Sequence, residues 1–323
     1  MITGNHSHLL DHLAPIAFYL NIPLLLTESQ MVHLCNTFYP QVKCFLVSEP
    51  DLLPYIAKQF DSLFISVITW NSELQFIFKT IYQKKIRLIY CPHGNSDKGA
   101  IIPHLESDDI ALIYGKQMKD RLKSRKQLFR IGNIRLSFYH EHKSFYTSLI
   151  EKELFPKLSS SNKTLLYAPT WQDSEDSSTF FDLCAFLCEN KPANYNLIIK
   201  LHPLLEERQP GHTFHLTETY KDFPHLLFLT HFPLIYPLLE RSDCFLGDYS
   251  AVGYDFLFFN RPMYFFQKND KASFLHCCGK KIHKKEKIYE IIEFHEKDER
   301  YSKKREQIYR YAFDEAIIFK RGL

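Results

Sequence analysis

Short apolar runs without polar alternation are the feature that most limits how this chain of 323 residues can fold. They consist largely of Ile, Leu, Val, Phe and Tyr, whereas a strand with one face in water alternates apolar and polar residues. The pattern predicts parallel strands that are covered on both faces. In the first half these strands are expected at Ile22–Leu26, Lys43–Val47, Leu63–Val67, Arg87–Tyr90 and Ile110–Tyr114.

Amphipathic segments of helical length separate these runs. Strand, helix and strand at this spacing are typical of a doubly wound α/β domain. The expected helices are Leu9–Leu20, Glu28–Thr37, Leu52–Phe60 and Glu73–Gln83.

The same pattern restarts after Ser159–Asn162, a polar stretch suited to a linker. We therefore predict two Rossmann-like α/β domains, residues 1–155 and 156–323, whose parallel sheets face a ligand-binding cleft. The expected strands of the second domain are Thr164–Ala168, Asn196–Lys200, Leu226–Leu229, Cys244–Gly247 and Pro262–Phe266, and its helices are Thr179–Glu189, Tyr254–Phe259 and the region from Lys287 onward.

Charge and cysteine content narrow the class of protein. A formal net charge of +3 does not require a nucleic-acid partner, and none is expected. No run reaches the roughly 18 apolar residues of a membrane-spanning helix, and the eight cysteines form no CxxC pair. These features predict a cytoplasmic protein. Basic residues at 280–287 and 303–305 indicate either a solvated helical face or contact with anionic lipid or a polyanionic substrate.

Residues that directly follow strands are candidates for the site, because ligands of open α/β sheets bind at the carboxyl ends of the strands. Gly4, His6 and His8 follow a short expected strand at the start of the sequence. We assign them to acceptor binding, with backbone donors at the helix start. Together with Asp11 and His12 they also suit a metal ion, but the spacing matches no strong motif and no metal is predicted.

A histidine follows the strand Arg87–Tyr90. Imidazole at that place can accept the proton of an attacking hydroxyl near neutral pH, so His93 is a candidate base. Gly94 permits close backbone approach, and Lys98 can neutralise phosphate. A turn histidine without chemistry is the alternative.

Two further strand ends carry groups suited to phosphate. Lys200 and His202 lie two residues apart and point to one side of an extended chain. Ser250 lies near a helix start, where a hydroxyl and free N–H groups can receive a pyrophosphate. Asp248 or Asp255 can hold a ribose or glycerol hydroxyl. Structural roles are the alternatives, a turn for the first pair and N-capping by Asp248 or Ser250 for the second.

From about Tyr90 to Phe266 these motifs occur in the order and spacing of a known family. The chain resembles the CDP-glycerol glycerophosphotransferase family, the teichoic-acid primases and polymerases, which have the GT-B architecture of two Rossmann-like domains. The motifs are His93-Gly94 with Lys98, Gly132–Arg135, Tyr167–Trp171, Lys200–Pro203, Asp248–Asp255 and Asn260–Pro262.

The resemblance implies that an acceptor hydroxyl attacks the β-phosphorus of CDP-glycerol and releases CMP, without a cofactor. His93 matches the base and His202 a histidine that binds the donor phosphates. A lipid-linked acceptor, and with it peripheral contact at the inner face of the membrane, is among the expectations. The residues assigned to donor binding are Lys98, Arg135, Thr170, Lys200, Asp248, Ser250 and Asp255.

Two departures from the family pattern leave alternatives open. Gln172 stands where the family usually has Arg, and Ala251 where it usually has a second serine. Both changes remove groups that can grip a pyrophosphate. A sugar-nucleotide glycosyltransferase, an enzyme of the UDP-N-acetylglucosamine 2-epimerase type and an inactive binding protein are the other hypotheses on this fold.

Overall fold

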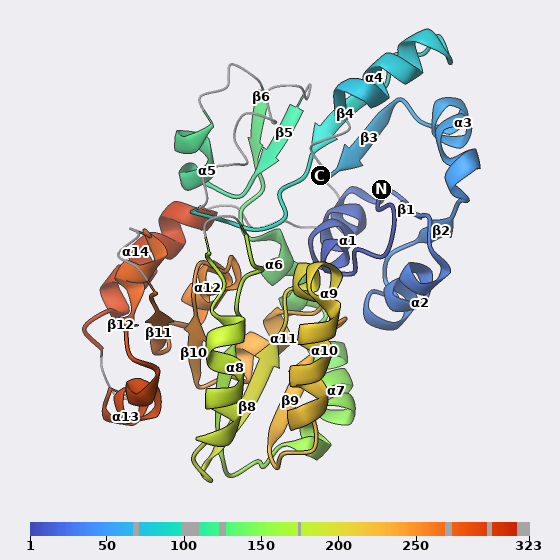
Figure 1. Cartoon of the computed structure of the whole chain (residues 1–323). Coiled ribbons are helices and arrows are strands. Elements are labelled where there is room, and N and C mark those ends of the chain that lie inside the picture. Colours follow the sequence, from blue (N-terminus) through green and yellow to red (C-terminus); the bar gives the residue numbers. More distant parts are fainter. Residues whose placement is uncertain are drawn as a thin grey trace. The chain divides into compact units, whose positions relative to one another are not determined.

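The computed structural model describes residues 1–66, 71–97, 110–122, 127–173, 176–268, 273–295 and 299–314. The chain divides into two compact units (Figure 1). Unit 1 comprises Met1–Phe138 and Arg310–Leu323, and unit 2 comprises Tyr139–Tyr309. This division differs from the predicted boundary at 155/156. The polar stretch at Ser159 is a turn inside unit 2, since its backbone N–H and carbonyl both pair with the Asn196 amide.

In the described part of unit 1 the paired strands are parallel, and they form sheets of order β1-β2 and β3-β4-β5-β6. Ile2 bridges Leu26 of β1, and the Met1 ammonium donates to the Phe64 carbonyl of β3. The expected first strand is thus a single bridge between β1 and β3, where the strand order reverses. The strands are β1 (Leu24–Leu26), β2 (Cys44–Leu46), β3 (Ser62–Ile65), β4 (Arg87–Tyr90), β5 (Ile110–Ile113) and β6 (Gln127–Arg130).

The helices of unit 1 bury an apolar stripe against these strands. In α3, Leu52 and Ile56 are four residues apart and therefore share one face, which packs with Leu63 of β3 and Leu88 of β4. The helices are α1 (His8–Leu20), α2 (Ser29–Phe38), α3 (Glu49–Gln59), α4 (Asn71–Thr80), α5 (Lys116–Arg121) and α6 (Ile134–Glu141), which continues into unit 2.

Unit 2 has one parallel sheet of order β12-β11-β10-β7-β8-β9. Counted from β7, this is the 3-2-1-4-5-6 order of a Rossmann fold, and the order reverses between β7 and β10. The strands are β7 (Lys163–Tyr167), β8 (Tyr195–Lys200), β9 (Leu226–Leu229), β10 (Cys244–Gly247), β11 (Met263–Phe266) and β12 (Lys280–Ile282).

Helices α8 and α10 lie side by side against this sheet (Figure 1). Leu183, Leu216 and Ile292, from α8, α10 and α13, share one buried cluster with Leu197 and Leu246 of the strands. The helices are α7 (Lys143–Glu153), α8 (Phe180–Glu189), α9 (Pro203–Arg208), α10 (Pro210–Tyr220), α11 (Tyr236–Glu240), α12 (Val252–Phe256), α13 (Ile288–Phe294) and α14 (Ser302–Phe313), with short 3₁₀ turns at Phe155–Lys157, Leu257–Phe259, Leu275–Cys278 and Lys285–Lys287.

The prediction of two α/β units with parallel sheets is confirmed, and each of the ten strands predicted between Ile22 and Phe266 overlaps an observed strand. The solvated helical face expected at 280–287 and 303–305 is wrong in two places. Residues Lys280–Ile282 form the edge strand β12. Arg305 is buried and donates to the Asn260 carboxamide oxygen. Among the described residues, no helix is long and apolar enough to cross a membrane.

Candidate functional site

The carboxyl edge of the unit 2 sheet, at the reversal between β7 and β10, is where a Rossmann-ordered sheet binds its ligand. Three predicted motifs leave the sheet at this edge. The segment from Thr170 follows β7, His202 follows β8, and Asp248 and Ser250 follow β10.

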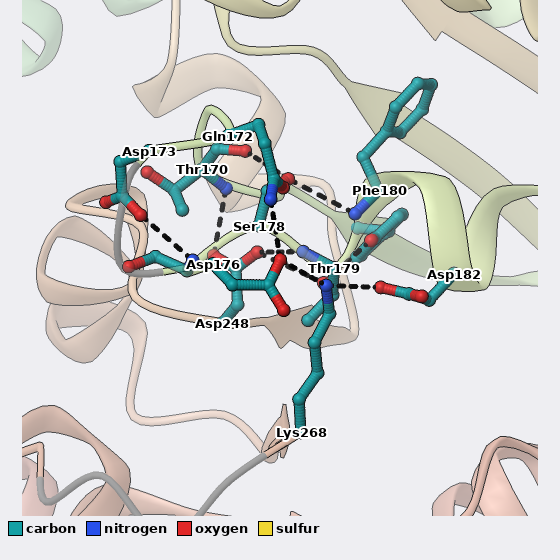
Figure 2. A network of polar contacts seen from close by, with 12 residues as sticks. Thr170, Gln172, Asp173, Asp176, Ser178, Thr179, Phe180, Asp182, Asp248 and Lys268 are labelled. Atoms are coloured by element: carbon teal, nitrogen blue, oxygen red, sulfur yellow. Dashed lines mark hydrogen bonds and ion pairs between the residues drawn. The ribbon is translucent and has the colours of Figure 1, made fainter.

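Asp248 ties two of these segments together (Figure 2). Its Oδ1 accepts from the backbone N–H groups of Thr170 at 2.9 Å and Ser250 at 3.1 Å. Its Oδ2 accepts from the Thr179 N–H at 3.0 Å and hydroxyl at 3.1 Å. A carboxylate offers about four lone-pair sites, so these donors saturate Asp248, which is only 1% exposed. These contacts give Asp248 a role in fixing the loops, and its predicted contact with the donor stays a prediction.

His276 forms a hydrogen bond with the backbone of Asp248. Its Nε2 lies 2.8 Å from the Asp248 carbonyl oxygen, which can only accept, so Nε2 carries a proton. Its Nδ1 then accepts from the Gln267 amide at 2.6 Å. The ring is fully buried beside Phe265 and Tyr249. Sequence reasoning missed His276, because it follows no predicted strand.

Ser250 and Asp255 lie on either side of the start of α12. Ser250 is buried at the residue before Ala251, the N-cap of Val252–Phe256, as the motif predicts. The N-cap residue of α12 is Ala251, which makes no side-chain hydrogen bond, and Asp248 accepts the N–H of Ser250 just before it. Asp255 is buried and accepts from the Tyr236 hydroxyl at 2.9 Å, so at least one of its oxygens serves the fold.

The segment after β7 is held by one hydrogen bond and two ion pairs (Figure 2). Gln172 donates to Asp176 at 2.6 Å. Lys268, just after β11, reaches Asp176 at 3.1 Å and Asp182 at 2.5 Å. The hydrogen bonds from Gln172 and Lys268 lower the pKa of Asp176. Lys268 was missed, although inspecting the end of the predicted strand Pro262–Phe266 would have found it.

His202 is oriented by its own helix. It is the N-cap of α9, and its Nδ1 accepts from the Leu204 N–H at 3.2 Å. In the neutral ring the proton therefore lies on Nε2, which makes that atom a hydrogen-bond donor. Lys200 ends β8, and its ammonium donates to the carbonyl of the next residue. At the other end of α9, the Arg208 guanidinium stacks on Trp171 at 4.3 Å.

The predicted acceptor residues lie at the reversal point of unit 1. Gly4 has φ +68°, a conformation that L side chains rarely adopt, and its N–H donates to the Thr27 hydroxyl at 2.9 Å. His6 and His8 lie edge to face, 5.9 Å apart, at the start of α1. The hydrogen bond from Gly4 to Thr27 joins the segment that follows the Ile2 bridge to the segment that follows β1.

His93 follows β4 in the same unit. Gly94, beside it, has φ +126°, which favours glycine. Burial lowers the pKa of His93, so the ring is neutral and able to accept a proton at pH 7. The ring of His12 packs against it edge to face at 6.4 Å. No group of three or more His, Cys, Asp or Glu side chains suited to a metal ion occurs in the described ranges.

Two predicted donor residues, Arg135 and Lys98, do not lie at the carboxyl edge of the unit 2 sheet in the described structure. Arg135 lies in unit 1, 4% exposed, where its Nη1 donates to Asp11 at 2.7 Å. The other Asp11 oxygen accepts from the Tyr39 hydroxyl at 3.0 Å. This buried ion pair explains Arg135 without a donor phosphate, because a buried charge requires a partner. Lys98 lies outside the described residues.

Comparison with known proteins agrees with the motifs. Residues 118–275 match the model of the CDP-glycerol:poly(glycerophosphate) glycerophosphotransferase family. The match includes His202, Asp248 and Ser250, and begins after His93. The teichoic acid ribitol-phosphate primase of Bacillus spizizenii is 30% identical over 186 residues, which are 54% of this chain and 45% of the primase. The teichoic acid glycerol-phosphate primase of that organism is 28% identical over 135 residues, which are 42% of this chain and 32% of that primase. The chain thus spans less than half the length of these relatives.

Solved structures show the fold. The wall teichoic acid polymerase TagF, as the H444N variant soaked with CDPG, superposes with a TM-score of 0.65 at 15% identity over 95% of this chain and 80% of that one. UDP-GlcNAc 2-epimerase from Neisseria meningitidis superposes with a TM-score of 0.58 at 11% identity over 98% and 95%. The family match and the two primases show that residues 118–275, with parts of the chain around them, are similar to the CDP-glycerol glycerophosphotransferase family.

Proposed function

We propose that the chain transfers a glycerol-phosphate or related polyol-phosphate unit from a CDP-activated donor to an acceptor hydroxyl. One observation carries the proposal. The family match spans the carboxyl edge of the unit 2 sheet, where Asp248 fixes the two loops that flank the strand reversal. We assign the donor to this edge and the acceptor to unit 1.

In the proposed reaction the acceptor oxygen attacks the β-phosphorus of the donor. A new O–P bond forms, the bond from the β-phosphorus to the bridging oxygen breaks, and CMP leaves with the electron pair. His93 takes the acceptor proton, which a neutral ring can do. Nε2–H of His202 donates to a phosphate oxygen as charge develops on it.

The residues around Ser250 bind the pyrophosphate in this proposal. The Ser250 N–H is already committed to Asp248, so the Ser250 hydroxyl is the group assigned to the donor. Thr170 and Ser250 are held by one carboxylate, so the loop needs little reorganisation when the donor binds. Gln172 is bonded to Asp176, which leaves His202 and Lys200 as the main phosphate ligands.

A lipid-linked acceptor and contact with the inner face of the membrane form the finer part of the proposal. Lys281, Lys284 and Lys285 are exposed around the end of β12. Such cations are attracted to anionic lipid by about 1 kcal/mol each near the surface. Co-sedimentation with phosphatidylglycerol vesicles that is lost in the triple Glu variant of these lysines supports this contact, and equal sedimentation of both proteins contradicts it.

The test of the reaction is CMP release from CDP-glycerol in the presence of a polyol-phosphate acceptor. We expect His93→Ala to lower kcat by about 10²–10⁴-fold, the usual contribution of a general base, with donor affinity unchanged. His33→Ala, an exposed histidine of the same unit, is the matched control. Donor binding without CMP release would favour the inactive binding protein, and binding of UDP-N-acetylglucosamine instead would favour the epimerase or glycosyltransferase alternatives.

A further inference from the structure

Among the described residues, none forms the hydrogen bond at Nδ1 of His93 that commonly orients a histidine base. In such residues one ring nitrogen donates to a carbonyl or carboxylate, which sets the tautomer and the ring angle. The Nδ1 atom of His93 is buried, and no described residue is its hydrogen-bond partner. Other contacts must therefore hold this ring.

A hydrogen-bond chain runs beside His93 and ends on the residue before it. The Tyr114 hydroxyl donates to the Pro92 carbonyl at 3.1 Å and lies 3.0 Å from Nδ1 of His12. A phenol has one proton, and the Pro92 carbonyl can only accept, so the Tyr114 oxygen accepts from His12. The proton of neutral His12 is thereby assigned to Nδ1.

His12, the residue of α1 at the end of these hydrogen bonds, also contacts the His93 ring. The imidazoles of His12 and His93 lie edge to face, with centroids 6.4 Å apart and planes at 85°. Tyr114 is buried against Phe313, at 5.4 Å between ring centroids, so the phenol has a fixed place. The backbone before His93 and its ring are thus contacted by two connected side chains.

We propose that His12 and Tyr114 are positioning residues for His93, and that their contacts take the place of a hydrogen bond at its Nδ1, for which the described part of the chain offers no partner. This inference rests on the proposed function of His93 as the base. His12 acts through its neutral Nδ1–H tautomer, because a protonated ring beside His93 would oppose uptake of the acceptor proton.

The charges around His12 fit that role. Burial, and next the positive charge of Arg135, lower the pKa of His12 well below its ordinary value, and His93 and His8 act in the same direction. Asp11 is the acidic group on the same helix, and its carboxylate is engaged with Arg135 and Tyr39. The environment therefore favours the neutral ring.

The experiment compares Tyr114→Phe, His12→Ala and His12→Asn with Tyr55→Phe, a tyrosine of α3, as the control. Tyr114→Phe removes one oxygen and retains the ring. We expect kcat for CMP release to fall about 10–100-fold, the size of a small misplacement of a reacting group, with the KM for CDP-glycerol within twofold. Since asparagine can donate to Tyr114 from the position of Nδ1, His12→Asn should recover at least threefold of the loss seen in His12→Ala.

A second readout does not depend on activity. Nitrogen-15 spectra of histidine-labelled protein report the tautomer and titration of His93, assigned through His93→Gln. We expect Tyr114→Phe and His12→Asn to change its tautomer ratio or its pKa, whereas Tyr55→Phe leaves both unchanged. An unchanged His93 spectrum in both variants, or a changed spectrum with kcat within twofold of wild type, overturns the inference. Absence of CMP release by wild-type protein refutes the proposed function instead, and the spectra still decide whether the pair positions His93.

Discussion

Replacing Asp248, just after β10, by Asn should destabilise unit 2 far more than the same change just before β10. The carboxylate accepts four hydrogen bonds, from three backbone N–H groups and one hydroxyl. An amide can satisfy the donors at one oxygen, but it presents N–H groups to the others. At about 1.5–3 kcal/mol for each hydrogen bond to a charged group, loss of two predicts about 4 kcal/mol.

The matched control is Asp243→Asn at the other end of the strand. Asp243 is exposed, and its Oδ2 accepts one N–H, from Thr164 at 2.7 Å. Its side chain can turn its remaining oxygen to the same donor, so the expected loss is about 1 kcal/mol or less.

Urea unfolding followed by Trp171 fluorescence measures both variants. The chain has two tryptophans, so a Trp70→Phe background leaves Trp171, in the segment that Asp248 holds, as the reporter of unit 2. We expect the midpoint for Asp248→Asn to fall with the slope unchanged, and binding of CDP-glycerol to weaken at least tenfold at low urea. A loss within 1 kcal/mol of the Asp243 control would refute the view that Asp248 is saturated by buried donors.

The other predictions concern single contacts. Arg135→Met should destabilise unit 1 by about 3–5 kcal/mol, the usual effect of breaking a buried ion pair. Its nucleotide affinity, measured by calorimetry, should remain that of wild type, and weaker binding by a folded variant would restore the expected donor role. Ser250→Ala should weaken donor binding about tenfold without changing the unfolding midpoint; equal affinity would remove the hydroxyl from the donor site. The lowered pKa values of His93 and His12 mean that the unfolded chain binds more protons below about pH 6.5. Unit 1 should therefore lose stability as pH falls from 6.5, by up to about 1.4 kcal/mol per pH unit for each histidine, and His12→Phe should reduce this slope in urea titrations between pH 5 and 7.

Sequence alone predicted the strands well because they are buried on both faces. In Cys244–Gly247 every residue is buried. A short run that is apolar on both faces is typical of a central strand in a parallel sheet. The missed strand Gln127–Arg130 has three exposed residues and lies at the edge of its sheet. Its sequence, Gln-Leu-Phe-Arg, is too short in apolar residues to form the continuous apolar run that predicted the other strands.

The strand-end rule selected candidates at the carboxyl edges of the two sheets, but it did not show which of their atoms were already engaged. Asp248 and Arg135 were candidates because of their charge and motif position. Their partners, Thr179 and Asp11, are 69 and 124 residues away along the chain, so only the tertiary structure reveals that both groups are used internally. His12 was considered only as a metal ligand, since its link to Tyr114 spans 102 residues.

The most direct test of the proposed donor is calorimetric titration of the purified protein with CDP-glycerol, CMP, UDP and UDP-N-acetylglucosamine. The Ser250→Ala variant serves as the control for the site. We predict saturable binding of the cytidine compounds by wild type, weaker binding by the variant and no binding of the uridine compounds. Selective binding of UDP-N-acetylglucosamine, or equal cytidine affinity in both proteins, would contradict a CDP-activated donor at the carboxyl edge of unit 2.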